Sequence, residues 1–304
     1  MPDFDEMNTK SLVSDRRKLL RNAGLGTAFA AASGLGLFGS TGAYAGEEKK
    51  EAHAGKRPSD ADILNFALNL EYLEAEFYLR GLTGTGLSSS DIDGVGETGE
   101  VTGGSAVPFK TQVIKDYVSS IADDERSHVL FLRAALGSAA VARPAIDLTN
   151  SFNTAAVAAG LIQPGGTFNP FADEASFLLG AYVFEDVGVT AYHGAAPLIR
   201  SKAYLSAAAG ILAVEAYHAA NVRTLLFQMG MGDATAKISA LRAAASGAAD
   251  DQGVVVNGLP NIIPTDSNAI AFSRTTTQVL NIVYLGGASG NFGFFPQGLN
   301  GAIA

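Results

Sequence analysis

The sequence contains no cysteine, and only four of its 304 residues are histidine. The lack of cysteine excludes disulfides, thiolate zinc sites, iron–sulfur clusters and cysteine nucleophiles. Charged residues are scarce at 17%, whereas 47% of the residues are hydrophobic, which is enough for a sizeable core. The chain also lacks a phosphate-binding loop, a dinucleotide-binding fingerprint and a nucleophile elbow. These absences leave little catalytic chemistry open besides that of carboxylates and imidazoles.

The chain has few basic residues: 21 basic and 30 acidic residues give a net charge of −9. Nucleic-acid phosphates require a basic surface, so we expect no nucleic-acid partner. An acidic surface is compatible with attracting cations, although most acidic proteins are simply soluble.

The first 45 residues resemble a twin-arginine export signal. Residues 15–21 read DRRKLLR, a Gly/Ala-rich run follows to about Phe38, and Ala43-Tyr44-Ala45 forms a small-x-small cleavage site. An uncleaved membrane anchor is the alternative, but the run is short and poor for spanning about 30 Å of hydrocarbon. We expect cleavage after Ala45, export to the periplasm or the extracellular space, and no stable membrane span in the mature chain. Residues 46–58, which include His53, are expected to form a solvated linker.

Two of the four histidines lie three positions after a glutamate, in the pairs Glu125–His128 and Glu215–His218. Both pairs fall in segments with helical periodicity, and residues three apart share one face of a helix. Each pair therefore directs a carboxylate and an imidazole toward the same point. One such pair is weak evidence, so the repetition is what indicates a metal site.

A two-metal site in a four-helix bundle takes a Glu-x-x-His from each of two helices and a single glutamate from each of the other two. Glu71 and Glu185 lie in two further helical segments, and each is followed seven residues later by a tyrosine, Tyr78 and Tyr192. The order Glu…Tyr, Glu-x-x-His therefore occurs twice, which indicates an internally duplicated helix pair. Glu74 is the alternative to Glu71, because the two lie near one face of the same helix.

With these residues the chain resembles the ferritin-like superfamily, which includes bacterioferritin, rubrerythrin and manganese catalase. This resemblance covers about residues 59–230. The segments LNFALNLEYLEAEFY (64–78) and AFSRTTTQVLNIVY (271–284) resemble the desiccation-related branch of that superfamily. The resemblance implies an all-α, ferritin-like four-helix bundle that carries two iron or two manganese ions.

In our assignment Glu71 and Glu185 are terminal ligands, one to each metal, and Glu125 and Glu215 are bridging carboxylates. His128 and His218 complete the set. Carboxylate-rich sites favour iron and manganese, and six such side chains would be costly to bury unpaired. A vestigial site is the alternative. Tyr78 and Tyr192 are expected either to hydrogen-bond ligands or pass electrons, or to be core aromatics. His193 is expected to be a cation at a helix C-terminus rather than a ligand.

The four helices are expected over 59–80, 109–136, 173–193 and 198–229. A Gly-rich loop at 81–107 separates the first two, and its acidic residues lack the spacing of an EF-hand calcium site. A long crossover, 138–170, joins helices two and three. Residues 231–304 are expected to form a helical and irregular extension, with helices near 234–248 and after Ser273. It either packs on the bundle or forms a partner-binding or oligomerisation surface.

Two functions of different classes follow. The first is an exported metalloprotein that reacts with dioxygen or peroxide, as an oxidase, peroxidase or catalase, in stress protection. The second is a non-catalytic envelope protein, associated with desiccation or stress, that uses the bundle as a scaffold. Iron storage in a hollow shell is a third possibility, which the long loop and the extension disfavour because they would complicate close symmetric packing.

Overall fold

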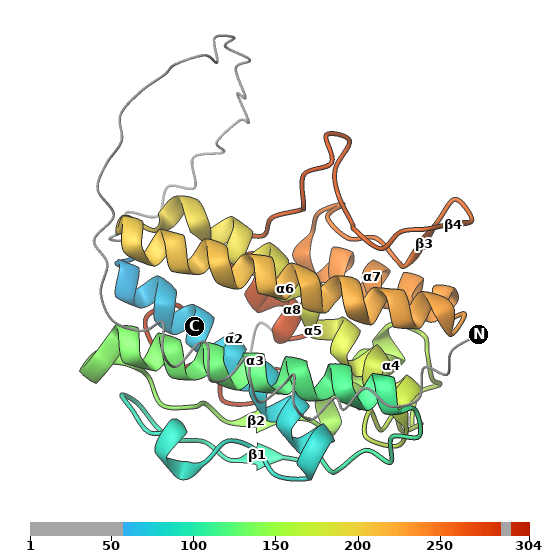
Figure 1. Ribbon diagram of the computed structural model, residues 1–304, viewed down its shortest axis with the longest axis horizontal. Helices are drawn as coiled ribbons and strands as arrows, with labels where there is room; N and C mark the ends of the chain where they lie inside the picture. Colours follow the sequence, from blue (N-terminus) through green and yellow to red (C-terminus); the bar gives the residue numbers. More distant parts are fainter. Residues whose placement is uncertain (1–56, 287–292) are drawn as a thin grey trace, which may run out of the picture. The chain divides into compact units, whose positions relative to one another are not determined.

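The computed structural model describes residues 57–286 and 293–304. The expected export signal and nearly all of the linker, His53 included, lie outside these residues. Within them the chain is mostly helical (Figure 1). Four long helices form the bundle: α2 (Asp60–Thr83), α3 (Gln112–Leu136), α5 (Glu174–Ala195) and α6 (Lys202–Gln228). No helix in the described part of the chain is both long enough and apolar enough for a membrane crossing.

The bundle is built from two helix pairs, α2 with α3 and α5 with α6, and α2 also packs against α5. In Figure 1, α3 and α6 run in front of the other two. Ser59 starts α2 with a capping box, since its side chain accepts from the Asp62 N–H while Asp62 accepts from the Ser59 N–H. α6 starts later than expected, because the short 3₁₀ helix η3 (Ala196–Leu198) precedes it and Ser201 provides its N-cap.

Aromatic side chains form the centre of the core at one end of the bundle. Phe77 of α2 stacks on Phe177 of α5 with 4.5 Å between ring centroids, and Phe184 of α5 meets Phe294 at 4.9 Å. Phe294 and Phe295 are almost fully buried. The C-terminal aromatic residues are therefore part of the hydrophobic core.

The Gly-rich segment after α2 is docked rather than free. It contains the 3₁₀ turn η1 (Ser89–Asp91) and the strand β1 (Val101–Thr102), which pairs in parallel with β2 (Ile146–Asp147) of the crossover. A Cβ at Gly99 would lie 2.1 Å from the Ala145 nitrogen, so glycine is required here for the close backbone approach.

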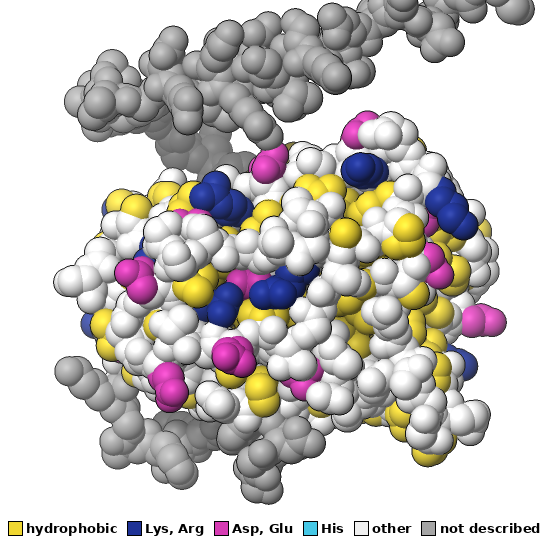
Figure 2. All heavy atoms as spheres, turned by 90° about the horizontal axis from the view of Figure 1, so that it is seen from below, with side chains coloured by type: hydrophobic (Ala, Val, Ile, Leu, Met, Phe, Trp, Pro, Cys, Tyr) yellow, Lys and Arg dark blue, Asp and Glu magenta, His cyan; other side chains and the backbone are white. Residues whose placement is uncertain are grey.

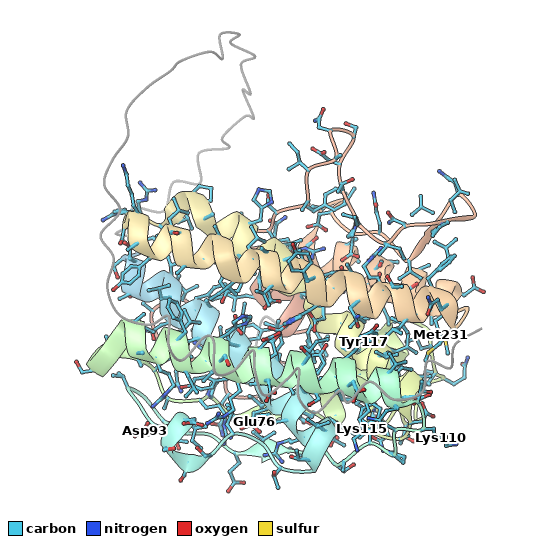
Figure 3. The ribbon with its side chains drawn as sticks, viewed as in Figure 1. Glu76, Asp93, Lys110, Lys115, Tyr117 and Met231 are labelled. Carbon is cyan, nitrogen blue, oxygen red and sulfur yellow. The ribbon has the colours of Figure 1, made fainter. Side chains whose placement is uncertain are left out.

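Charged side chains also hold this loop. Asp91 accepts from Arg126 at 3.0 Å, and Asp93 pairs with Arg133, so both aspartates have arginine partners. Glu76, buried near the same side of the bundle as Asp93 (Figure 3), pairs with Arg143 of the crossover. On the face shown in Figure 2, acidic and basic side chains are interspersed among uncharged ones.

The crossover and the C-terminal extension contain further elements. In the crossover these are η2 (Gly137–Ala139) and α4 (Asn150–Ala158), and sequence analysis missed α4. The extension contains α7 (Gly232–Ser246), a hairpin of β3 (Val255–Val256) and β4 (Leu259–Pro260), and α8 (Thr276–Val283). α7 and α8 lie at the two positions expected for helices, and α8 packs against both α7 and α5.

Candidate metal centre

The six residues singled out by the sequence lie together in the middle of the bundle. Each of the four helices contributes one glutamate, and α3 and α6 each add a histidine: Glu71, Glu125, His128, Glu185, Glu215 and His218. All are buried, with exposed fractions between 0% and 8%. Glu125, whose charged sequence neighbours would suit a surface position, is fully buried.

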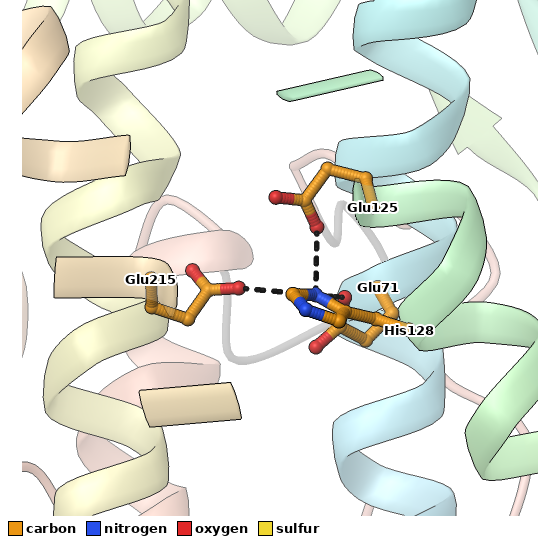
Figure 4. A group of neighbouring side chains, drawn as sticks. All are labelled: Glu71, Glu125, His128 and Glu215. Carbon is orange, nitrogen blue, oxygen red and sulfur yellow. Dashed lines mark hydrogen bonds and ion pairs between the residues drawn. The ribbon is translucent and has the colours of Figure 1, made fainter. Parts of the chain in front are cut away.

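One group of four surrounds His128 (Figure 4). Its Nδ1 lies 3.2 Å from Glu71 Oε2, 3.5 Å from Glu125 Oε2 and 3.6 Å from Glu215 Oε1. One ligand atom from each of the four residues falls within 4.8 Å of all the others. This spacing is compatible with a single ion held between them.

A second group surrounds His218. Its Nδ1 lies 2.8 Å from Glu125 Oε1 and 3.8 Å from Glu185 Oε2, and these three residues also meet the 4.8 Å criterion. Glu125 thus belongs to both groups, with one oxygen toward each histidine, as a bridging carboxylate requires. Glu215, the other expected bridge, belongs to the His128 group alone. The ligand roles of all six residues stay predictions.

Six buried polar atoms of the cluster have no hydrogen bond among the described residues. The atoms are both carboxylate oxygens of Glu125, both of Glu215, Glu185 Oε2 and His218 Nδ1. His218 Nδ1 and Glu125 Oε1 are close, yet not aligned for a hydrogen bond. Each buried polar atom without a partner costs about 1–3 kcal/mol, so six together need an explanation. Cations between the side chains would satisfy all six, and the oxygen and imidazole donors suit iron or manganese.

Burial and mutual charge shift the pKa values in this cluster. Burial raises the pKa of Glu71 to about 7 and that of Glu185 to about 8, although a histidine beside each opposes the shift. Burial also raises the pKa of Glu215 well above its ordinary range. At Glu125 the effect of burial is outweighed by the two imidazoles, which lower the pKa of this carboxyl. Glu125 is therefore the carboxylate most firmly held in its charged form.

The pKa values of both histidines are raised, whereas burial alone would lower them. Burial lowers the pKa of His128, but Glu71 and Glu125 outweigh it and raise the value to about 11. For His218 the contacts with Asp124, Glu125 and Glu185 raise the pKa to about 10. Without a metal, the two imidazolium groups partly neutralise the carboxylates. Metal binding would displace their protons.

The repeated tyrosines contact the glutamates of the opposite helix. Tyr78 of α2 donates to Glu185 of α5, and Tyr192 of α5 donates to Glu71 of α2. Burial raises the pKa of both tyrosines well above the usual value, so both keep the proton that they donate. Both tyrosines hydrogen-bond candidate ligands, and both are also buried in hydrophobic core clusters, so the two alternatives hold together.

Sequence analysis did not single out Asp124 for the site. Its Oδ2 lies 3.2 Å from His218 Nε2, on the side of the ring away from Glu125. A carboxylate at the outer nitrogen fixes the orientation of a metal-binding histidine. Asp124 lies in the charged run Asp123-Asp124-Glu125-Arg126, which is typical of a solvated surface, so the sequence did not indicate this contact. The duplication is not exact, since Val214 stands before Glu215 where Asp124 stands before Glu125.

Glu74 is buried beside the cluster but belongs to neither group of possible ligands. Gly188 of α5 makes room next to it, because a Cβ there would lie 2.2 Å from Glu215 Oε2 and 3.5 Å from Glu74 Oε1. Of the two candidates on α2, Glu71 is the one that contacts His128, with its Oε2 3.2 Å from the His128 Nδ1. His193 lies outside the cluster, near the end of α5, with its Nδ1 3.2 Å from the Phe272 carbonyl oxygen.

Comparison with known proteins agrees with this architecture. The ferritin-like domain family matches residues 59–228, and the chain belongs to this family. It is 30% identical over 280 residues to the ferritin-like catalase Nec2 of Nesocodon mauritianus, covering 82% of this chain and 86% of that protein. It is also 31% identical over 252 residues to the desiccation-related protein PCC13-62 of Craterostigma plantagineum, covering 73% and 76% of the two chains. The expected desiccation-related, ferritin-like branch is thereby confirmed.

Proposed function

We propose that this protein is a di-metal oxidoreductase that disproportionates hydrogen peroxide as part of stress protection. One observation carries the proposal: Glu125 directs one oxygen toward each of two histidine-containing groups of possible ligands, and neither oxygen has a hydrogen bond among the described residues. The relative named as a ferritin-like catalase supports peroxide as the substrate. Two peroxide molecules give two of water and one of dioxygen, so one is reduced, the other is oxidised, and no external reductant is needed.

The side chains divide the work between holding metal and handling protons. Glu71, Glu125, Glu185, Glu215, His128 and His218 would hold two iron or two manganese ions. Such a pair supplies Lewis acidity and a change of oxidation state when bound. Tyr78 and Tyr192 orient the terminal glutamates through their hydrogen bonds, and Asp124 orients the His218 ring.

Glu74 is suited to hold a proton beside the cluster. Burial raises its pKa well above the ordinary value, and the nearby carboxylates Glu125, Glu185 and Glu71 add to the effect. A protonated carboxyl at this position can donate to an oxygen of the substrate and take the proton back. Disproportionation needs such a group, because protons leave one peroxide and join the other.

Oxygen release from peroxide by purified, metal-loaded protein tests the proposal. Replacing Glu125 with Ala should reduce turnover by more than about 100-fold, because loss of a residue that only hydrogen-bonds to a metal ligand already costs roughly 10–100-fold. The variant should keep its helicity, since alanine is well tolerated in a helix. Asp123→Ala is the matched control, since Asp123 is an exposed member of the same charged run. If the metal-loaded wild type shows no turnover with peroxide, dioxygen or ferrous iron, the enzyme proposal is wrong.

The second candidate is a non-catalytic scaffold, which the relative named as a desiccation-related protein favours. In this case metal would stabilise the bundle, and the function would belong to the docked loop and the extension. The same assay separates the two, because a scaffold would bind metal in stoichiometric amounts and leave peroxide unchanged.

We further propose that the protein is exported after folding, through the twin-arginine segment in residues 1–45. A twin-arginine route suits a metalloprotein because it moves folded proteins. Replacing Arg16 and Arg17 with Lys should retain the protein inside the cell, as fractionation would show. Export of the Lys variant at the wild-type level would contradict the proposal.

A further inference from the structure

A small cavity of about 20 Å³ lies between α2, α5 and the end of α8. Its lining is apolar except for the side chain of Glu74, and none of the six candidate ligands belongs to it. The other residues of the wall are Leu70, Leu73, Phe184, Val187, Gly188 and Val283. One water needs about 10–15 Å³, so the cavity has room for a molecule of about two heavy atoms.

The carboxyl group of Glu74 is the polar side-chain group of this wall. Glu74 is 5% exposed, and it makes no hydrogen bond or ion pair with any described residue. A Cβ on the wall residue Gly188 would lie 3.5 Å from Glu74 Oε1, so this oxygen faces the space that the missing side chain leaves. Buried carboxyl oxygens rarely lack a partner, and a molecule in the cavity can supply one.

Gly188 also connects the cavity with the candidate metal centre. The same added Cβ would lie 2.2 Å from Oε2 of Glu215, a buried oxygen of the cluster that has no hydrogen bond among the described residues. Only the missing side chain of Gly188 separates this ligand oxygen from the cavity wall. A molecule held beside Glu74 is therefore adjacent to the candidate metal centre, on its α2–α5 side.

The size and lining of the cavity define the kind of molecule that fits. The apolar walls disfavour an ion, because they offer it no partners in exchange for water. A hydroxyl group suits Glu74, since it can both donate to a carboxyl oxygen and accept from a carboxyl hydrogen. Hydrogen peroxide has two heavy atoms and two such groups. Dioxygen has the same size but cannot donate, and alkyl hydroperoxides are larger.

We propose that this cavity is the docking site for hydrogen peroxide beside the metal centre, with Glu74 as its hydrogen-bond partner and Val283 as a residue that limits its size. The identity of the ligand rests on the proposed peroxide reaction. The cavity itself selects neutral hydroxyl compounds of this size, so docking of a stable analogue requires neither metal nor turnover.

Methanol is such an analogue, because it has two heavy atoms and one hydroxyl group. Crystals of the metal-free protein soaked in methanol should show it in the cavity, with its oxygen about 3 Å from a carboxyl oxygen of Glu74. Crystals soaked in tert-butanol should show no alcohol there. A methanol-soaked cavity without methanol, or one that also accepts tert-butanol, would overturn the proposal, whether or not the loaded protein turns over peroxide.

A filled cavity tests the docking site in the metal-loaded protein. Val283→Ile adds one methyl group at the cavity wall, whereas Val279→Ile adds it at a buried position one turn earlier on α8, outside the cavity. In the first variant kcat/KM for hydrogen peroxide should fall about tenfold or more at wild-type metal content, and in the second it should stay unchanged. An active wild type with an equally active Val283→Ile variant would overturn this inference alone, whereas an inactive wild type would contradict the proposed function.

An enlarged cavity tests the size limit, and it does not depend on the folding of the filled variant. Val283→Ala removes two methyl groups, and ethyl hydroperoxide has two carbon atoms more than hydrogen peroxide. Ethyl hydroperoxide should compete with hydrogen peroxide in Val283→Ala, and in the wild type its inhibition constant should be at least about tenfold higher. Equal inhibition of the two proteins, or none of either, would overturn the size limit.

Two substitutions of Glu74 test its role as the hydrogen-bond partner. Glu74→Gln keeps a hydrogen-bonding group of the same size, whereas Glu74→Leu removes it. The KM for hydrogen peroxide should rise about tenfold in the Leu variant and stay near the wild-type value in the Gln variant, whatever the change in kcat. The same KM in both variants would show that Glu74 does not hold the substrate.

Discussion

Tyr192 of α5 donates its hydroxyl hydrogen to Glu71 of α2, and the reverse contact joins Tyr78 of α2 to Glu185 of α5. In both helices the tyrosine follows the glutamate by seven residues, about 10 Å along a helix axis. The two contacts form together when the packed helices run in opposite directions, so that each tyrosine lies opposite the other helix's glutamate. The sequence duplication therefore becomes a reciprocal pair of hydrogen bonds around the candidate metal centre.

Loss of one of these hydroxyls should weaken metal binding without unfolding the bundle. In Tyr192→Phe the Glu71 carboxylate loses its orienting donor, so metal affinity should fall about 10–100-fold. Competition with a chelator of known affinity measures the change. Tyr204→Phe is the control, because the hydroxyl of the half-buried Tyr204 donates to the carbonyl oxygen of Ala135 and to none of the candidate ligands. Equal metal affinity in the two variants would show that the hydrogen bond to Glu71 has no role in binding.

Gly188 should be sensitive to a single added methyl group. In Gly188→Ala the new Cβ would clash with Glu215 Oε2, so Glu215 must move and metal content should drop. Gly210→Ala on α6 is the matched helical control, since nothing lies within 4 Å of its added Cβ. That control should gain about 0.5–1 kcal/mol in the free energy of unfolding and keep its metal. Full metal content in Gly188→Ala would contradict the placement of Glu215.

Chelation should lower the melting temperature of the metal-loaded protein. An ion that binds only the folded state stabilises it by mass action, by about 2.7 kcal/mol at a hundred times its dissociation constant. Calorimetry before and after verified metal removal measures the shift. Glu125→Ala serves as the control, because it lacks the shared carboxylate and should respond little to chelation. An unchanged melting curve for the wild type would mean that the cluster binds no metal of consequence.

The stability of the metal-free protein should fall as the pH rises through neutrality. The pKa values of Glu71 and Glu185 rise from an ordinary 4.5 to about 7 and about 8, so the folded state keeps protons that the unfolded chain has lost. Their contribution is fully present below pH 4.5 and is lost as the pH rises to about 8. His128 and His218, with raised pKa values, act in the same direction above pH 6.5.

Urea unfolding of the metal-free protein at about pH 5.5 and about pH 8 checks this expectation. The double substitution Glu71→Gln with Glu185→Gln removes two of the titrating groups and should flatten the dependence. The metal-loaded protein should instead become more stable as the pH rises, because metal competes with these protons and binds more tightly at higher pH. A metal-free protein that is more stable at the higher pH would contradict the assignment of these shifts.

The sequence by itself was enough to predict the four helices, the six clustered side chains and the Glu–Tyr repeat. These features depend on short-range geometry, since residues three, four or seven apart have a nearly fixed relation on any helix. Boundaries were less predictable, because capping by residues such as Ser201 decides where a helix begins. The helix α4 was missed, since nine residues with little periodicity gave too weak a pattern.

Only the tertiary structure decided which side chains meet across the bundle. Glu71 and Glu74 share a helix face, and the contacts of Glu71 with His128 and Tyr192 distinguish them. Asp124 looked like part of a solvated run until His218 of another helix was placed against it. The docking of the Gly-rich loop joins segments distant in the chain, through the pairing of β1 with β2 and the contact of Asp91 with Arg126. Such contacts arise from packing between helices, which no local pattern encodes.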